Sequence, residues 1–441
     1  MKKILIANRG EIARRILQTC DKLGVASVVV YSQADKELPY VREATVSREI
    51  GEPPAAKSYL NGDKILEVAK EENVDAIHPG YGFLSENAGF VRAVENAGLT
   101  FIGPGAGVVE MMGDKVRARQ TMQAADVPVV PGSDGAVNDV EEAAKIAADI
   151  GYPVMLKASA GGGGIGMQRC GSEEELRKAF ASNQNRAKAY FGSADMFVEK
   201  MIENGRHIEV QVFGDRHGNV VHLFERDCSI QRRNQKVIEE TPTPFLSEAA
   251  KEKMFSAAVR AARHVGYVNA GTIEFIVDSD ENFYFLEMNT RLQVEHPVTE
   301  MTTGVDLVEW QMKVADGEPL PAGQNDLQQD GHAMEFRLYA EDPEKFLPSP
   351  GDIQAFTYPA LPGTRVDTGV ESGTKVTPFY DPMIAKVIVS GSGRPEAIAK
   401  AREFFRGLTL TGIKNNAPLF EKILQNDDFL QGNYTTKFLQ R

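Results

Sequence analysis

Lys3-Ile4-Leu5-Ile6-Ala7 begins the stretch of sequence that decides the fold class of this chain. Apolar residues follow at helical spacing up to Gly24, and Ala26–Tyr31 is a continuous valine-rich run, as a strand buried on both faces would be. The alternation continues, with expected helices at 65–72 and 87–97 and expected strands at 76–78 and 99–102. Repeated β-α-β units with short links predict an α/β architecture, in which helices cover a parallel sheet.

The turn after the first expected strand lacks a dinucleotide-binding fingerprint. Its sequence is Asn8-Arg9-Gly10-Glu11-Ile12, whereas a Gly-x-Gly-x-x-Gly turn would bring backbone N–H groups against a pyrophosphate. We therefore expect no dinucleotide site at this position, although the topology is Rossmann-like.

Length and composition narrow the class of protein. The chain has 441 residues, of which 42% are hydrophobic and 25% charged, and this predicts a multidomain globular protein. The net charge of −13 argues against nucleic-acid binding, and no apolar run approaches the ~20 residues of a membrane helix. Met1–Arg9 has too few apolar residues for a signal peptide. Three widely spaced cysteines without a Cys-x-x-Cys motif suit a reducing compartment, so we expect a cytoplasmic protein.

The pattern of elements changes after Lys115. A helix is expected over 140–150, and two short strands at 154–157 and 166–170 flank a glycine-rich loop. The polar stretch 323–330 predicts a linker before a final module. The other expected elements are strands at 208–213, 220–225, 272–277, 332–338 and 385–389, and helices at 248–265, 396–405 and 418–424.

The glycine-rich loop is Lys157-Ala158-Ser159-Ala160-Gly161-Gly162-Gly163-Gly164-Ile165-Gly166. It lacks the Gly-Lys-Ser/Thr ending of a P-loop, and it leads into a strand instead of a helix. Consecutive glycines let backbone N–H groups approach an anion, and Lys157 would add a positive charge to a polyphosphate. The loop predicts a lid over phosphate groups, and the alternative is a flexible hairpin tip.

Two acidic residues lie on neighbouring strands of an expected hairpin. If 279–282 form a four-residue turn, Asp278 pairs with Phe283 and, in the same register, Glu274 pairs with Glu287. Like charges directly opposite one another destabilise a sheet unless a cation lies between them. Asn289 projects from the same face as Glu287 and adds a neutral oxygen, so the hairpin predicts a Mg²⁺ or Mn²⁺ site. The alternative is a solvated hairpin with incidental acids.

The run after this hairpin combines a guanidinium with a carboxylate. Arg291, Gln293 and Glu295 alternate, so on an extended segment they would share the face of Asn289. A fixed guanidinium beside a carboxylate can bind and deprotonate a small planar oxyanion. The alternative is a simple ion pair between Arg291 and Glu295.

The segment Glu225–Lys236 is basic within an acidic protein. It favours either a site for a small anionic ligand or a solvated loop. Cys228 in this segment has no evident partner base, so a buried inert thiol is expected. The seven histidines show no paired metal-binding spacing, which argues against zinc.

Several long motifs occur together in one known family, in the same order along the chain. The chain resembles, from end to end, the biotin carboxylase subunit of biotin-dependent carboxylases, in particular the acetyl-CoA carboxylase type, which has the ATP-grasp fold. The stretches that carry the resemblance are the glycine loop, Ile6–Ala13, His78–Asn87, Met112–Lys115, Arg226–Ser229, Glu287–Arg291, Gln293–Glu300 and Ala340–Pro343.

The resemblance implies three domains and a set of ligand-binding residues. The domains would be a Rossmann-like N-terminal domain at 1–114, an ATP-grasp domain at 115–330 with a mobile lid subdomain at about 131–203, and an α+β C-terminal domain at 331–441. The implied ATP-binding residues are Lys115, Lys157, Gly163, Gly164, Glu199, Lys200, Met201, Ile202, His207, Gln231, Asn234, Glu274 and Glu287. The metal ligands would be Glu274, Glu287 and Asn289, the bicarbonate cradle would be Lys236, Arg291, Gln293, Val294 and Glu295, and Arg337 would bind biotin.

The resemblance implies the first half-reaction of a biotin-dependent carboxylase. For the acetyl-CoA carboxylase type, it also implies a role in fatty acid biosynthesis. Glu295 would deprotonate bicarbonate, which attacks ATP in the presence of Mg²⁺ or Mn²⁺ to give carboxyphosphate, and Arg337 would stabilise the biotin enolate that captures CO₂. The catalytic residues would be Arg291, Glu295, Arg337 and Lys236. The chain has no Ala-Met-Lys-Met sequence, so we expect biotin on a separate carrier protein, with carboxyltransferase subunits as further partners and a homodimer as the assembly.

Two positions depart from the family's pattern. Ile165 stands in the lid where the family usually has Arg, and Asn234 stands where it usually has His. Neither position is an implied metal or bicarbonate ligand, so we expect altered nucleotide affinity with catalysis retained. Two alternatives remain at this stage: an ATP-grasp ligase that joins a carboxylate to an amine, and a nucleotide-binding regulatory subunit without catalysis.

Overall fold

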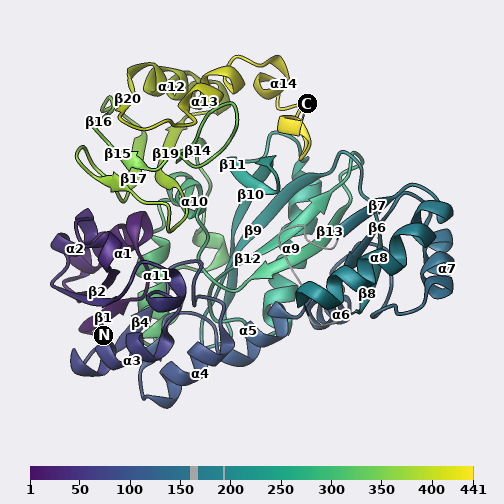
Figure 1. Cartoon of the computed structure of the whole chain (residues 1–441), viewed down its shortest axis with the longest axis horizontal. Coiled ribbons are helices and arrows are strands. Elements are labelled where there is room, and N and C mark those ends of the chain that lie inside the picture. Colours follow the sequence, from purple (N-terminus) through teal and green to yellow (C-terminus); the bar gives the residue numbers. More distant parts are fainter. Residues whose placement is uncertain (159–166, 192–193, 441) are drawn as a thin grey trace.

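The N-terminal part of the chain is a parallel sheet covered by helices. The computed structural model describes residues 1–158, 167–191 and 194–440. The five parallel strands have the order β3-β2-β1-β4-β5 (Figure 1), and the prediction of an α/β architecture is confirmed. These strands are β1 (Lys3–Ile6), β2 (Ala26–Ser32), β3 (Val46–Gly51), β4 (Ala76–His78) and β5 (Thr100–Phe101). The helices of this part are α1 (Gly10–Leu23), α2 (Pro39–Glu43), α3 (Gly62–Glu71), α4 (Ala88–Asn96) and α5 (Ala106–Gly113).

Apolar periodicity explains why α1 forms where the sequence predicts it. Ile12, Ile16 and Cys20 are buried against the sheet, as the spacing of a helix face requires. Gly24 ends the helix in the left-handed conformation, with φ of 67°, which a residue without a side chain adopts at little cost.

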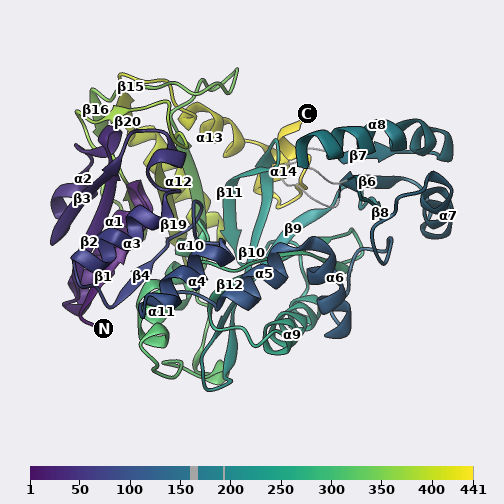
Figure 2. The same cartoon turned by 60° about the horizontal axis from the view of Figure 1, so that its bottom comes forward.

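A small arm projects from the body of the molecule (Figure 2). Its three-stranded antiparallel sheet has the order β7-β6-β8, and two helices, α7 and α8, pack against it. The predicted hairpin around the glycine loop is confirmed by the pairing of β6 with β7, while the loop at 159–166 lies outside the described residues. The elements of the arm are α7 (Val140–Ile150), β6 (Val154–Ala158), β7 (Met167–Cys170), α8 (Glu173–Phe191) and β8 (Met196–Lys200).

The largest sheet has eight strands and runs through the centre of the molecule (Figure 1). Its order is β13-β12-β9-β10-β11-β14-β19-β17, so the sheet continues across the predicted domain boundary at 330/331. The strands are β9 (Arg206–Gly214), β10 (Val220–Arg232), β11 (Gln235–Thr241), β12 (Asn269–Val277), β13 (Phe283–Asn289), β14 (His332–Tyr339), β17 (Thr364–Thr368) and β19 (Met383–Gly391). Because the sheet is continuous, residues from both sides of that boundary are held at fixed positions relative to one another.

Helices cover this sheet and complete the core. The apolar faces of α6 (Lys115–Ala124) and α9 (Glu248–His264) share one buried cluster with β9 and β12, while α12 (Arg394–Gly407) and α13 (Ala417–Ile423) share another with β14 and β19. The remaining α-helices and strands are α10 (His296–Thr303), α11 (Leu307–Ala315), α14 (Asp427–Leu430), β15 (Gly351–Asp352), β16 (Ala355–Thr357), β18 (Lys375–Val376) and β20 (Thr409–Thr411).

The expected linker at 323–330 is packed against the large sheet. It contains a short 3₁₀ turn at Gln324–Asp326, and Gln324 Oε1 accepts a hydrogen bond from the backbone N–H of His222 at 2.9 Å. Within the described part of the chain, the helices are either too short or too polar to cross a bilayer.

Candidate functional site

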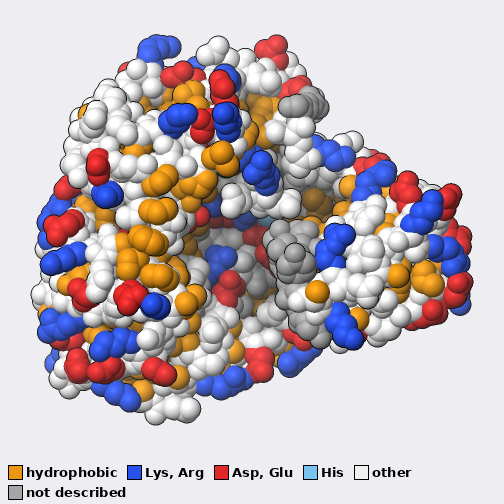
Figure 3. All heavy atoms as spheres, viewed as in Figure 1, with side chains coloured by type: hydrophobic (Ala, Val, Ile, Leu, Met, Phe, Trp, Pro, Cys, Tyr) orange, Lys and Arg blue, Asp and Glu red, His pale blue; other side chains and the backbone are white. Residues whose placement is uncertain are grey.

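A cavity of about 680 Å³ lies between the large sheet and the arm, where Figure 3 shows the surface hollowed beside blue and red side chains. It gathers residues from each of the strands β6 to β14 and from the first half of α6. The predicted site residues that line it are Lys115, Lys157, Glu199, His207, Gln231, Asn234, Lys236, Glu274, Glu287, Asn289, Arg291, Gln293, Val294, Glu295 and Arg337.

The acidic hairpin places Glu274 opposite Glu287, as predicted, but through a different turn. Val277, not Asp278, pairs with Phe283, and the backbone N–H of Asp278 donates to the carbonyl of Asn282 at 2.9 Å across the turn. The register shifts by one residue at Leu286, which lies between the paired parts of β13. This bulge compensates for the changed register at the turn and restores the pairing of the two acids. The four-residue turn was therefore wrong, because Asp278 caps the turn by accepting backbone N–H bonds from Asp280 and Asn282.

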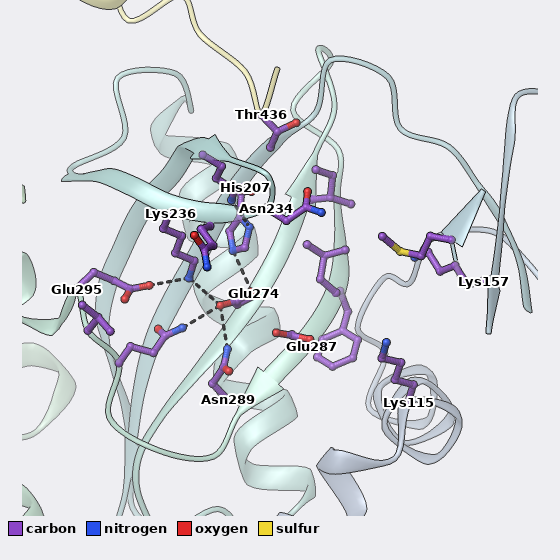
Figure 4. A pocket seen from close by; sticks show the side chains of 18 of the residues that line it. Lys115, Lys157, His207, Asn234, Lys236, Glu274, Glu287, Asn289, Glu295 and Thr436 are labelled. Atoms are coloured by element: carbon purple, nitrogen blue, oxygen red, sulfur yellow. Dashed lines mark hydrogen bonds and ion pairs between the residues drawn. The ribbon is translucent and has the colours of Figure 1, made fainter. Parts of the chain in front are cut away.

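Several hydrogen-bond donors surround the Glu274 carboxylate (Figure 4). Its Oε1 accepts hydrogen bonds from Lys236 Nζ at 2.8 Å and from Asn289 Nδ2 at 2.9 Å, and its Oε2 lies 3.0 Å from His207 Nε2. Burial raises the pKa of Glu274, but the charges of Lys236 and His207 outweigh it and hold that pKa well below its ordinary value. Glu274 is therefore ionised in the folded protein.

Glu287 faces Glu274 across the same cavity (Figure 4). The negative charge of Glu274, followed by burial, raises the pKa of Glu287. The two carboxylates are hard oxygen donors of the kind that Mg²⁺ prefers, whereas Asn289 turns its Nδ2 toward Glu274 and its Oδ1 toward Arg291. These residues fit a divalent cation, which would remove the repulsion between the two acids.

Glu295 is held by two cations, one of which, Lys236, also contacts Glu274. Its Oε1 accepts from Lys236 Nζ at 2.6 Å, and its Oε2 accepts from Arg337 Nη2 at 2.9 Å. Burial raises the pKa of Glu295, yet Lys236 and Arg337 together hold it well below its ordinary value. Lys236 thus links the two carboxylates Glu274 and Glu295 within one network.

The segment between β13 and α10 is bent, so the prediction of an extended run at 290–295 is wrong. Arg291 turns back, where its Nη2 donates to Asn289 Oδ1 at 3.0 Å and its Nε donates to Glu86 Oε2 at 2.9 Å. Gln293 Nε2 donates to Glu274 Oε1 at 2.8 Å. The bend exists because Glu86 and Arg226 bind this segment from other parts of the fold, and it still brings the predicted side chains to one cavity.

Two lysines face the acidic hairpin from the other side of the cavity (Figure 4). Lys115 lies at the start of α6, and burial lowers its pKa despite the nearby charge of Glu287. Lys157, at the end of β6, forms an ion pair with Glu199 of β8. Both side chains line the same cavity as the two acids of the hairpin.

The stretch 199–202, expected to bind ATP, reaches the cavity only in part. Glu199 lines it, whereas Lys200, Met201 and Ile202 are not among the described residues of its wall. Lys200 Nζ instead donates to the Gly151 carbonyl at 2.9 Å, and the Met201 N–H donates to Pro153 O at 3.1 Å. Gly163, Gly164 and Ile165 lie outside the described residues.

The backbone conformation at position 234 favours asparagine. It follows Arg233 in a two-residue turn between β10 and β11, and both residues have positive φ, 52° for Arg233 and 65° for Asn234. Two-residue hairpins of this kind favour asparagine, because its short polar side chain tolerates the left-handed region.

A buried cluster of polar side chains beneath the cavity was not predicted from the sequence. Arg226 and Glu209 are wholly buried, and Arg226 Nε donates to Glu209 Oε1 at 2.6 Å while its Nη2 donates to Gln293 Oε1 at 2.6 Å. Glu209 Oε2 also accepts from Lys236 Nζ at 2.6 Å. The signal was present, because His207, Glu209 and Gln211 alternate with apolar residues along a buried strand.

A second cavity of about 560 Å³ adjoins the first. The two share five lining residues, Arg291, Val294, Arg337, Tyr339 and Asp381. The second cavity opens between the carboxyl ends of the N-terminal strands and the 379–384 segment, with Tyr81, Phe83, Phe379 and Tyr380 on its wall. Its aromatic lining contrasts with the charged wall of the first.

Comparison with known proteins identifies the family. The chain matches the family descriptions "Biotin carboxylase, N-terminal domain" over residues 1–109, "Carbamoyl-phosphate synthase L chain, ATP binding domain" over 114–323 and "Biotin carboxylase C-terminal domain" over 335–441. It is 57% identical to a biotin carboxylase of Halalkalibacterium halodurans, over 99% of this chain and 97% of that one. It is 54% identical to biotin carboxylase 2 of Bacillus subtilis, over 100% of this chain and 99% of that one.

A solved structure shares both the fold and much of the sequence. It is the biotin carboxylase domain dimer of 2-oxoglutarate carboxylase from Hydrogenobacter thermophilus, in complex with MgADP, ADP and bicarbonate. The TM-score is 0.95 at 48% sequence identity, and the match covers 100% of this chain and 97% of that one. On its sequence, its fold and the residues that line its cavity, the chain belongs to the biotin carboxylase family of ATP-grasp enzymes.

Proposed function

We propose that the protein carboxylates biotin, using ATP and bicarbonate, as the first half-reaction of a biotin-dependent carboxylase. The observation that carries this proposal is the network in which Lys236 joins the acid of the hairpin, Glu274, to a second acid, Glu295, that also contacts Arg337. A ligase that only activated a carboxylate for an amine would need the hairpin acids but would not need Arg291, Glu295 and Arg337 together. This difference favours bicarbonate and biotin as substrates.

The first step is the activation of bicarbonate. We assign Lys236, Arg291, Gln293, Val294 and Glu295 to the bicarbonate cradle, with Glu295 as the base. In the ligand-free arrangement, Lys236 and Arg337 donate to Glu295 and lower its pKa. Bicarbonate bound beside them would share these donors, and this would raise the pKa of Glu295 toward the value that a base requires.

The second step is phosphoryl transfer. Deprotonated bicarbonate attacks the γ-phosphorus of ATP, ADP leaves, and carboxyphosphate forms. We assign Glu274, Glu287 and Asn289 to Mg²⁺ or Mn²⁺, which would neutralise charge on the phosphates when bound. Lys115 and Lys157 would balance the remaining phosphate charge, and His207, Gln231, Asn234 and 199–202 would contact the nucleotide, with Gly163 and Gly164 in the lid.

The last step transfers the carboxyl group to biotin. Carboxyphosphate breaks down to CO₂ and phosphate, the phosphate accepts the ureido proton of biotin, and the biotin enolate attacks CO₂. Arg337 would stabilise the enolate, because its guanidinium lines both cavities. The aromatic second cavity would admit the biotin ring to this position.

We also propose the assembly in which the protein acts. Biotin would arrive on a separate biotin carboxyl carrier protein, and carboxyltransferase subunits would use the product to carboxylate an acyl-CoA, as in acetyl-CoA carboxylase. A cytoplasmic location agrees with three free, buried cysteines. The dimer of the Hydrogenobacter relative supports a homodimer, which light scattering of the purified protein would test. The divisions at 114/115 and 330/331 stay proposals for the domain boundaries.

The test of the function is the dependence of ADP release on its substrates. We expect ADP release with MgATP to require bicarbonate and to rise with free biotin, and Glu295→Gln to lower this rate by about 10²–10⁴-fold, the usual contribution of a general base. Glu344→Gln, an exposed acid, is the matched control and should retain the wild-type rate. A rate of ADP release that does not depend on bicarbonate, or that rises with an amine acceptor instead, would contradict the proposal.

A further inference from the structure

Lys386 of β19 is a fully buried cation outside the cavity wall. Its Nζ donates to the backbone carbonyl of Val294 at 2.9 Å and lies 3.1 Å from Glu11 Oε2 and 3.9 Å from Asp367 Oδ2. Burial of an ammonium group is costly unless its protons find acceptors. One of these acceptors is a backbone group of the predicted bicarbonate cradle, so Lys386 contacts the site from behind.

The orientation of the Val294 carbonyl affects the position of the Glu295 side chain. Val294 lines both cavities, and its peptide leads directly into Glu295. The Gln293 side chain on one side is fixed by Arg226, and the Glu295 carboxylate on the other by Lys236. Rotation of the peptide between them would move the Glu295 carboxylate relative to the cavity.

Lys386 itself is held by a rigid frame. It is the register partner of Arg337 on β14 and of Asp367 on β17, so three strands fix its position. Glu11 reaches it from the first turn of α1. A β-carbon at Gly369 would lie 2.6 Å from the Glu11 backbone nitrogen, which shows how closely the 369 segment packs against that turn. The carbonyl of Val294 is thereby tied to both helix α1 and the large sheet.

We propose that Lys386 is a positioning residue for bicarbonate activation: its ammonium group fixes the Val294 carbonyl, and with it the peptide that carries Glu295, without contacting a substrate. The inference rests on the proposed use of Gln293–Glu295 as the bicarbonate cradle. The competing explanation is that Lys386 only neutralises Glu11, in which case removal of both charges together would leave the site unchanged.

Steady-state kinetics of the full chain separate the two explanations. ADP release is measured against bicarbonate and, separately, against MgATP for the wild type, Lys386→Met and the double variant Lys386→Met/Glu11→Gln. We expect both variants to raise the KM for bicarbonate by about 10–100-fold, as loss of a supporting contact does elsewhere, with the KM for ATP within about twofold of the wild type. The double variant removes both members of the buried Lys386–Glu11 pair, so it keeps the test usable if Lys386→Met alone fails to fold.

Lys400→Met is the matched control, because Lys400 also donates to a backbone carbonyl, that of Ser390, at 2.8 Å and away from the cavity. It should leave both KM values unchanged. A double variant with a wild-type KM for bicarbonate, or equal rises in the KM for ATP and for bicarbonate, would overturn the inference. If the wild-type protein releases ADP without needing bicarbonate, the proposed function fails instead, and this outcome is distinct from a failure of Lys386.

Discussion

At the scale of single residues, the site depends on like and opposite charges that the fold brings close together. Glu274 is the register partner of Glu287, and its negative charge raises the pKa of Glu287. The donors Lys236 and His207 compensate Glu274 within the protein. The hairpin therefore has one acid already paired with cations and a second whose ionisation a bound divalent cation would favour.

This asymmetry predicts the effect of Glu287→Gln. The amide keeps the shape of the side chain but loses its charge, so we expect the Mg²⁺ concentration for half-maximal ADP release to rise at least about tenfold, equivalent to about 1.4 kcal/mol of binding free energy. A titration of ADP release with MgCl₂ at fixed ATP measures this. Asp280→Asn, an exposed acid in the turn of the same hairpin, should not shift the titration. An equal shift in both variants would argue against metal binding by Glu287.

At the scale of elements, local backbone features orient the site residues. The bulge at Leu286 corrects the register that the turn at 278–282 sets, and the positive φ of Asn234 closes the hairpin of β10 and β11 beside the cavity. The start of α6 is another device: Asp114 caps the helix by accepting hydrogen bonds from the N–H groups of Val116 and Arg117. Lys115 is the first residue of that helix and lines the cavity.

Removal of this cap should affect both stability and nucleotide binding. We expect Asp114→Ala to lower the free energy of unfolding by about 1 kcal/mol, the usual value of a lost N-cap. The KM for ATP should also rise, because the first turn that holds Lys115 loosens. Asn61→Ala is the matched control, since Asn61 caps α3, away from the cavity, through the N–H of Lys64. Urea unfolding and ATP kinetics should show a similar stability loss in both variants but a changed KM only in Asp114→Ala.

At the scale of the whole molecule, buried charges join segments that are far apart in the sequence. Glu240 of β11 is buried, and its carboxylate contacts His332 Nε2 at 2.6 Å, Arg394 Nε at 2.7 Å and the Tyr434 hydroxyl at 2.5 Å. These three partners belong to β14, the start of α12 and the C-terminal segment. One carboxylate thus ties the large sheet to the helices and the tail that cover it.

This network predicts a pH-dependent contribution to stability. Burial raises the pKa of Glu240, but hydrogen bonds from His332 and Arg394 outweigh it and lower the pKa from 4.5 to about 2. Because the folded-state pKa is depressed, the stabilisation is fully present above pH 4.5 and is lost as the pH falls through 2. We expect Glu240→Gln to lower the free energy of unfolding by about 3 kcal/mol at pH 7, since it leaves Arg394 without its counter-charge.

Chemical denaturation at several pH values measures this effect. The difference between wild type and Glu240→Gln should shrink steadily below pH 4.5. Glu403→Gln, an exposed acid on the same helix as Arg394, should unfold like the wild type throughout. A difference that stays constant down to pH 2 would show that the charge of Glu240 is not the cause.

The sequence by itself determined the elements and most of the residues of the cavity. Strand and helix boundaries follow from local apolar spacing, as in α1, and the motifs that line the cavity are contiguous, as in Glu287–Arg291. The pairing of Glu274 with Glu287 was also predictable, although the turn that produces it was not, because a bulge elsewhere in the strand offsets the register that the turn sets.

Only the tertiary structure decided how these residues meet. The bend at 290–295 is imposed by Glu86 and Arg226, the buried cluster of polar side chains beneath the cavity depends on Glu209, and the Val294 carbonyl is held by Lys386, 92 positions away in the sequence. The physical reason is that apolar periodicity acts between neighbours along the chain, whereas a buried charge is stable only beside partners that the completed fold supplies. Those long-range pairs set which atoms face the cavity, and no local pattern specifies them.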